Sequence, residues 1–330
     1  MNRFSHLPLL AVLVAASTIG ACSNDTAPTA PPSLTAPAGA SANRSSGAIE
    51  VGPVTTVDMP GATATVLFAI NNHGVAVGRY ASAGRTHGLM RSATGELTTI
   101  DFPGAGFTVA GGLNNRGDVV GWYTLPAAPA IRHGFLLRDG AFTTFDPPGS
   151  TFTNTLGIND RGDIVGRYCT LTVCREPGSG DFHGFLLRDG TFTTIDVPES
   201  TETNAWAIND RGTILGGYGV AGGESKLFLL RRGELTTFAL PNGKALSQDR
   251  GGLGARGDIV GKYCDASPCL TGPKGAHAFV ISRGQLTTID VPGALGTGGF
   301  GINARREVVG GYYDVGSVLH GYVMRLEKRS

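Results

Sequence analysis

Three short motifs recur six times each from residue 54 onward, and this repetition constrains the fold more than any other feature. The first motif, TTIDVP or a variant of it, stands at 55–60, 98–103, 143–148, 193–198, 236–241 and 287–292. The second, INDRGDIVGRY or a variant, stands at 70–80, 113–123, 158–168, 208–218, 253–263 and 302–312. The third, typically HGFLLRDG, begins at His87, His133, His183, Lys226, His277 and His320. Repeats of about 40–50 residues with several short strands each are typical of β-propeller blades.

Each repeat divides into four short strands. In the third repeat, strands at 155–159 and 164–168 form one predicted hairpin, and strands at 183–188 and 191–196 form another. The second hairpin turns at Asp189-Gly190, and an Asp-Gly pair between two β-rich runs is a strong signal for a tight turn. The chain contains 51 glycines, which fits a fold with many tight turns and close strand approaches. The sequence therefore predicts an all-β protein.

The two ends of the repeat region predict how the blades close into a ring. The region begins on the fourth-strand motif, with a strand at 54–58, and finishes on the third-strand motif at 320–325. The first strand is therefore free to complete the last blade, which removes exposed sheet edges. We expect a six-bladed β-propeller of four-stranded blades over residues 49–330, closed by the N-terminal strand completing the last blade.

The first 48 residues predict export and anchoring. Residues 1–21 form a signal peptide with a positive start at Arg3 and an apolar stretch of about 13 residues, shorter than the roughly 20 that span a bilayer. The stretch ends at Cys22 in a sequence that resembles the lipobox of bacterial lipoproteins, so Cys22 is the expected lipidation site; cleavage elsewhere is the alternative. Residues 22–48 are rich in Ala, Pro, Thr and Ser and predict a disordered tether. We expect a lipid anchor in the cell envelope, at the outer membrane if the organism has one.

Residues 54–330 resemble the HAF family of extracellular repeats found in exported bacterial proteins. The resemblance is carried by the strings GINDRGDIVGRY, HGFLLRDG and FTTIDVP, and five of the six third-strand motifs begin with histidine. It implies export and a propeller-like fold. It implies no activity and no catalytic residue.

Hairpin register places the histidine of each third strand opposite an aspartate of the fourth strand. The predicted pairs are His133 with Asp146, His183 with Asp196, His277 with Asp290, and His320 with Asp58 across the closure. The first repeat has an extra turn residue between His87 and Asp101, and the fourth has Lys226 and Ala239 instead. Such a pair is compatible with a general base, a metal ligand or a cross-strand hydrogen bond that fixes register. A catalytic site is normally singular, so the repetition favours the structural interpretation and no metal site.

The remaining cysteines form two matching sets. Cys169 and Cys174 follow the second-strand tyrosine of the third repeat, and Cys264 and Cys269 follow that of the fifth. In an exported protein this spacing predicts the disulfides Cys169–Cys174 and Cys264–Cys269. A metal shared by all four is the alternative, but the third and fifth blades are not adjacent in a six-bladed ring.

The loops between second and third strands, and between blades, vary in length and sequence, so their face of the ring is the candidate binding surface. Six tyrosines end the second strands toward this face and are interpreted as packing residues between blades: Tyr80, Tyr123, Tyr168, Tyr218, Tyr263 and Tyr312. The residue before each tyrosine varies. The candidate ligand-binding residues are Arg79, Trp122, Arg167 and Lys262, with Trp206 and Phe107 as weaker additions. They suit a sugar or a polyanionic glycan through stacking and charge-assisted hydrogen bonds, and the alternative is an ordinary solvated face.

The balance of 27 basic and 26 acidic residues argues against a nucleic-acid partner. The sequence favours a monomeric binding module for a glycan or an envelope or extracellular protein, with no cofactor and membrane contact only through the lipid. A hydrolase or lyase acting on a cell-surface or environmental polysaccharide is the second possibility, by analogy of fold, and a structural part of the envelope is the third. Glu202, Asp249 and Asp265 are acidic candidates that no motif joins. No catalytic residue is therefore predicted, and the sequence leans against an enzyme.

Overall fold

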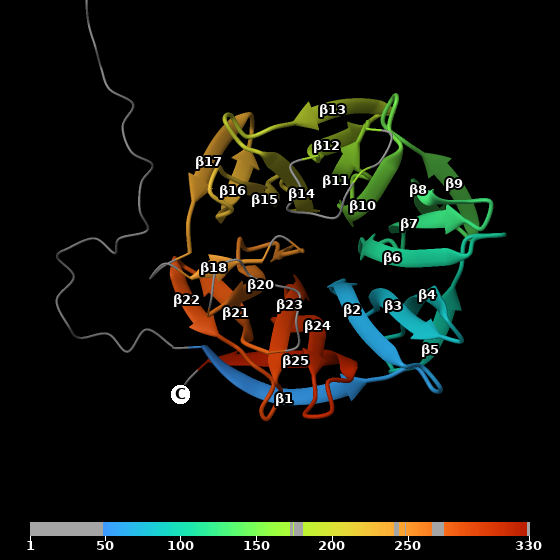
Figure 1. The fold of residues 1–330 in the computed structure, drawn as a ribbon. Coiled ribbons are helices and arrows are strands. Elements are labelled where there is room, and N and C mark those ends of the chain that lie inside the picture. Colours follow the sequence, from blue (N-terminus) through green and yellow to red (C-terminus); the bar gives the residue numbers. More distant parts are fainter. Residues whose placement is uncertain are drawn as a thin grey trace, which may run out of the picture. The chain divides into compact units, whose positions relative to one another are not determined.

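The computed structural model describes residues 49–171, 174, 181–240, 244–247, 249–265 and 274–328. The predicted signal peptide, Cys22 and the tether lie outside these residues and stay predictions. Twenty-five strands are present in the described part of the chain, where no helix occurs and therefore none that is long and apolar enough to cross a membrane. The strands form six antiparallel groups around a common axis (Figure 1).

The first three blades each contain four strands that pair in sequence order, with the first strand nearest the axis (Figure 1). The first blade consists of β2 (Ala64–Ile70), β3 (Ala76–Ser82), β4 (Arg85–Arg91) and β5 (Leu97–Ile100). The second consists of β6 (Phe107–Leu113), β7 (Val119–Leu125), β8 (Ala128–Arg138) and β9 (Ala141–Phe145). The third consists of β10 (Phe152–Ile158), β11 (Ile164–Cys169), β12 (His183–Arg188) and β13 (Thr191–Ile195).

The other three blades follow the same plan with one irregularity. The fourth consists of β14 (Glu202–Ile208), β15 (Ile214–Gly219), β16 (Ser225–Arg231) and β17 (Glu234–Phe238). The fifth has a divided first strand, β18 (Ala245–Leu246) and β19 (Gly252–Leu253), followed by β20 (Ile259–Cys264), β21 (Ala276–Ser282) and β22 (Gln285–Thr288). The sixth consists of β23 (Gly296–Ile302), β24 (Glu307–Tyr313), β25 (Leu319–Lys328) and β1 (Ile49–Val57).

The N-terminal strand completes the last blade. β1 pairs antiparallel with β25 from Ile49 opposite Lys328 to Val57 opposite Gly321, and the two strands lie side by side in Figure 1. Val57 is buried in the adjoining core. The predicted all-β, six-bladed propeller closed by this strand is therefore confirmed.

Glycines in the second strands allow the sheet of each blade to pack tightly. A Cβ atom on Gly121 in β7 would lie 1.9 Å from the carbonyl oxygen of Val109 and 2.7 Å from the ring of Phe135. Only glycine fits this close approach, because real Cβ atoms do not come within 3.0 Å of such neighbours. The glycine thus lets the phenylalanine of the third strand lie across the second strand and fill the core of the blade.

The turn between first and second strands carries a polar network that links neighbouring blades. In the third blade, Asn159 donates from Nδ2 to Asp163, at 2.9 Å, and to the carbonyl of Asn209 in the next blade, at 3.2 Å. Burial raises the pKa of Asp163, but hydrogen bonds from Arg188 and the turn residues outweigh this effect and lower the pKa to about 2. The same side-chain-to-carbonyl link recurs from Asn71 to Asn114, from Asn114 to Asn159 and from Asn303 to Asn71.

Five of the six blades contain a hydrogen-bonded histidine–aspartate pair at the register that the sequence predicts. The Nδ1-to-carboxylate distances are 2.7 Å for His87–Asp101 and His133–Asp146, 3.0 Å for His183–Asp196, 2.6 Å for His277–Asp290 and 2.8 Å for His320–Asp58. Each histidine ring lies against the tyrosine at the end of the second strand of its own blade. The hydroxyl of that tyrosine bonds a threonine of the fourth strand.

These contacts correct part of the expectation for the tyrosines, because their repeated partners lie mainly within one blade. Tyr123 also stacks on Phe102 from the preceding blade, with ring centroids 3.6 Å apart, so packing between blades is a second role at that position. The pairs tie the second, third and fourth strands together, which supports the structural interpretation. None of the five histidines lines the axial pocket described below.

A stability prediction follows from the two histidines that contact a second aspartate. His277 forms hydrogen bonds with Asp290 and Asp265. Burial lowers the pKa of His277, but these hydrogen bonds outweigh the burial, so the pKa is raised. The pKa of His320 is raised in the same way by Asp58 and Asp314. A raised pKa means that the protonated form stabilises the fold. This stabilisation is complete below about pH 6.5 and is lost as the pH rises through the raised pKa.

Urea unfolding between about pH 6 and about pH 9 measures this effect. The double variant His277→Gln, His320→Gln is expected to lose more unfolding free energy at the lower pH than at the higher pH. An equal loss at both ends of the range would contradict the prediction.

Candidate functional site

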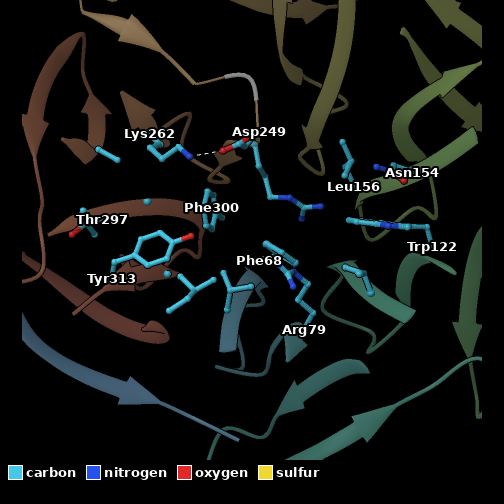
Figure 2. Close-up of a pocket in the computed structure, with 18 of the residues that line it drawn as sticks. Phe68, Arg79, Trp122, Asn154, Leu156, Asp249, Lys262, Thr297, Phe300 and Tyr313 are labelled. Atoms are coloured by element: carbon cyan, nitrogen blue, oxygen red, sulfur yellow. Dashed lines mark hydrogen bonds and ion pairs between the residues drawn. The ribbon is translucent and has the colours of Figure 1, made fainter. Parts of the chain in front are cut away.

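A pocket with a volume of about 410 Å³ lies on the axis of the ring. Its walls are formed by first strands and by the ends of second strands, close to where the second-to-third-strand loops begin. Figure 2 shows labelled side chains of the pocket that belong to the first, second, third, fifth and sixth blades. The residues that line it are Val66, Phe68, Arg79, Phe107, Val109, Trp122, Arg132, Asn154, Leu156, Arg167, Asp249, Arg250, Lys262, Ala276, Gly296, Thr297, Gly298, Phe300, Gly311, Tyr313 and Leu319.

The pocket is strongly cationic, because five basic side chains and one carboxylate line it. The basic residues are Arg79, Arg132, Arg167, Arg250 and Lys262. The carboxylate belongs to Asp249, which forms an ion pair with Lys262 (Figure 2). Burial raises the pKa of Asp249, but the charge of Lys262 and its hydrogen bond outweigh this and lower the pKa. Asp249 is therefore ionised and paired with Lys262, and the lining of the pocket contains four arginines in addition to this pair.

Aromatic rings lie among these charges. Phe68 and Phe300 contact each other with ring centroids 5.8 Å apart, and the guanidinium carbon of Arg250 lies 4.2 Å from the centre of the Phe68 ring. Arg132 lies 5.9 Å from the Phe107 ring and 4.3 Å from the ring of Phe152. Trp122 and Tyr313 complete the aromatic lining (Figure 2). The pocket therefore offers flat apolar faces next to cationic hydrogen-bond donors.

Five of the six residues predicted to bind ligand are brought together here. Arg79, Trp122, Arg167 and Lys262 all line the pocket, as does Phe107. The first four share one position, directly before the second-strand tyrosine, so equivalent places in the blades face the same axis.

Trp206 does not line the pocket. Its side chain is 2% exposed, belongs to the apolar core and borders a narrower cavity deeper in the channel. A Cβ atom on Gly217 would lie 2.2 Å from the Trp206 ring, so the tryptophan occupies the space that the side chain before the tyrosine takes in other blades. The prediction of Trp206 as a residue of the same ligand site is corrected accordingly: it fills the core of the fourth blade.

Sequence reasoning missed Arg250 and Arg132 and left Asp249 unconnected. The signal for Arg250 and Asp249 is the number of residues between the fourth-strand motif and the next second-strand motif. This distance is 17 residues from 236 to 253, whereas it is 15 residues from 193 to 208 and in the other repeats. The structure places this insertion in the divided first strand of the fifth blade. There, seven residues from Leu246 to Gly252 lie opposite four residues of β20, whereas in the first blade five residues from Thr65 to Ala69 lie opposite four.

The inserted loop carries Arg250 toward the axis. Its Nη1 atom donates a hydrogen bond of 2.6 Å to the carbonyl of Gly111 in β6, on the opposite side of the ring. Burial lowers the pKa of this guanidinium to about 9, and the neighbouring charges of Arg167 and Arg79 act in the same direction. The buried cation therefore lies in a field that favours the arrival of an anion.

The cysteines lie at the same end of the ring. Cys169 and Cys174 form a disulfide after β11, as their spacing predicts. Cys264 at the end of β20 is also disulfide-bonded, and Cys269, its predicted partner, lies outside the described residues. Over the described part of the chain, no group of three or more His, Cys, Asp or Glu side chains is arranged to hold a metal ion. Glu202 is buried in β14, and Asp265 bonds His277, so neither joins the pocket.

Comparisons with known proteins find a similarity of fold and no similarity of family. No protein-family model and no curated protein matches the chain. Among solved structures, a catalytically inactive virginiamycin B lyase from Staphylococcus aureus is 13% identical with a TM-score of 0.46, covering 84% of this chain and 99% of that one. The Aleuria aurantia lectin is 11% identical with a TM-score of 0.48, covering 80% and 94%. The β-propeller domain of the trilobed protease from Pyrococcus furiosus is 8% identical with a TM-score of 0.48, covering 81% and 96%. This chain is similar to them in fold alone, and the HAF resemblance stays a prediction.

Proposed function

We propose that this protein is a binding module of the cell envelope whose axial pocket takes an acidic glycan. The observation that carries the proposal is the composition of the pocket lining, in which five basic side chains accompany one carboxylate. Guanidinium groups bind carboxylates through paired hydrogen bonds, and they do so most strongly where water is excluded.

The aromatic side chains favour a sugar as the carrier of the negative charge. Phe68, Phe107, Trp122, Phe300 and Tyr313 present apolar faces between the charged groups. The flat apolar faces of sugar rings pack on aromatic side chains, while hydroxyl and carboxylate oxygens accept hydrogen bonds from arginine. A glycan with carboxylate groups matches both kinds of lining at once.

The expected location belongs to the same proposal. Lipidation of Cys22 and a flexible tether over residues 22–48 would hold the propeller at the envelope, where acidic polysaccharides are found. A rigid ring on such a tether can reach a ligand at some distance from the membrane.

Titration calorimetry with an oligogalacturonide tests the proposal, with a neutral galacto-oligosaccharide of equal length as the reference ligand. The protein carries Cys22→Ser so that it can be purified without lipid. We expect the acidic ligand alone to bind. Arg79→Gln is expected to weaken binding about tenfold or more, because a charge-assisted hydrogen bond contributes about 1.5–3 kcal/mol.

Arg256→Gln is the matched control, since this exposed arginine lies in the turn at the other end of the channel from the pocket. Equal losses of affinity in Arg79→Gln and Arg256→Gln would contradict a charge-specific pocket. Binding of the neutral ligand as tight as that of the acidic ligand would contradict it as well. Chromatography of the ligand after incubation separates binding from the second possibility: shortened products would favour a hydrolase or lyase.

A further inference from the structure

The side chain of Arg250 forms the floor of the pocket. It extends from the inserted loop of the fifth blade to the carbonyl of Gly111 in the second blade, and these blades lie opposite each other in the ring (Figure 1). Its guanidinium carbon lies 4.2 Å from the centre of the Phe68 ring and 5.6 Å from that of Trp122. Arg250 is 5% exposed, so its side chain is buried where it crosses the axis.

Beyond this floor the channel is too narrow for a sugar ring. Arg250 also borders the next cavity, which measures about 90 Å³ and is lined largely by glycines and aliphatic side chains. A further cavity of about 80 Å³ lies among the asparagines of the turns between first and second strands. Each of these cavities has less than a quarter of the volume of the pocket. The pocket is therefore closed at its inner end to any sugar chain.

Two hydrogen-bond donors at the floor have no acceptor among the described residues. They are Nη2 of Arg250 and Nε1 of Trp122, and both atoms are buried. Both groups donate and cannot accept, so only an acceptor can satisfy them. An unpaired buried donor destabilises the empty site, and a ligand oxygen at this place removes that penalty.

We propose that Arg250 and Trp122 bind the carboxylate of a terminal sugar unit, so that the pocket takes the end of a uronate chain rather than an internal segment. This inference rests on the proposed function and names the part of the glycan that enters. An internal segment needs two ways out of the site, whereas the floor leaves only the outer opening. The volume of about 410 Å³ lies near the lower end of the range of about 300–1,000 Å³ for ligand pockets, which suits a chain end.

Titrations with a short and a long oligogalacturonide of defined lengths test the mode of binding. End binding predicts one protein per chain and the same affinity per chain at both lengths. More than one protein on the long chain would overturn end binding while the proposed function stands. If the wild-type protein binds neither ligand, the proposed function fails and this inference fails with it.

Trp122→Phe tests the floor, because it removes the Nε1 donor and keeps an aromatic ring. We expect about a tenfold loss of affinity at unchanged stoichiometry. Trp206→Phe is the control, since Nε1 of Trp206 is also buried without an acceptor but lies outside the pocket. Equal affinities in the two variants would overturn the assignment.

Arg250→Lys is a second variant that keeps the positive charge and removes the unpaired Nη2 donor. It is expected to weaken the binding of the oligogalacturonide, with a thermal unfolding transition that shows the ring is intact. Unchanged affinity in this folded variant would also overturn the role of Arg250.

Discussion

Deletion of residues 49–58 is expected to abolish the cooperative unfolding transition of the propeller. The deleted segment contains β1, which pairs with β25 along its length. Val51, Val54 and Val57 of this strand pack against the cores of the closing blade and its neighbour, and burying a valine contributes about 1.5–3 kcal/mol. The lost packing is on the order of 5 kcal/mol, comparable to the lower end of the whole stability of a domain.

The deletion also leaves β25 as an exposed edge, which invites pairing between molecules. Differential scanning calorimetry and size-exclusion chromatography measure the two effects, and we expect a lost transition and higher oligomers. The control removes residues 37–46, an equal length of the predicted tether, and is expected to keep the melting temperature. A normal transition after deletion of 49–58 would show that the ring does not depend on the closing strand.

Gly310→Ala is expected to destabilise the protein by about 3 kcal/mol, the upper end of the usual cost of overpacking. A Cβ atom at this position in β24 would lie 1.9 Å from the carbonyl oxygen of Gly298 and 2.8 Å from the ring of Tyr322. The carbonyl belongs to the paired strand β23, and Tyr322 is fully buried, so neither neighbour can move without disturbing the sheet.

Gly299→Ala is a matched control in the same blade. Gly299 is a buried strand glycine, and the nearest atom to an added Cβ would be 3.5 Å away, which is an ordinary contact. The free energy of unfolding of the Gly299→Ala variant, measured in urea, is expected to change by less than about 1 kcal/mol, because alanine also restricts the unfolded chain. Similar losses in both variants would mean that close approach to Gly298 is not the reason for the glycine at 310.

Much of the fold follows from the sequence because the same local rules act six times. Asp189 and Gly190 both adopt positive φ, as the predicted two-residue turn requires. The register set by that turn brings His183 opposite Asp196. The closing strand was predictable because the repeat region begins and ends at different points of the unit.

Residues of the candidate site could be predicted from the sequence only where they occupy a position that recurs in the repeats. The position before the second-strand tyrosine varies in identity while its place in the blade is fixed, so Arg79 and Lys262 could be assigned to one surface. Arg250 stands in an insertion that has no counterpart in other blades, and its path across the axis depends on tertiary contacts with Gly111. Trp206 was misassigned because the space beside Gly217, which its ring fills, is invisible in sequence.

The asparagine hydrogen bonds between neighbouring turns affect which positions of this protein can change during evolution. An asparagine that bonds the next blade must suit two blades at once, so a change there disturbs its neighbours as well. In the fifth blade the corresponding residues are Gly254 and Ala255, which have no side-chain amide or carboxylate to join the series. This blade is therefore free of a constraint that the first, second, third and sixth blades share, and it is also the blade with two additional residues and the arginine on the axis. A new ligand preference can thus evolve by altering one blade while the other five keep the ring intact.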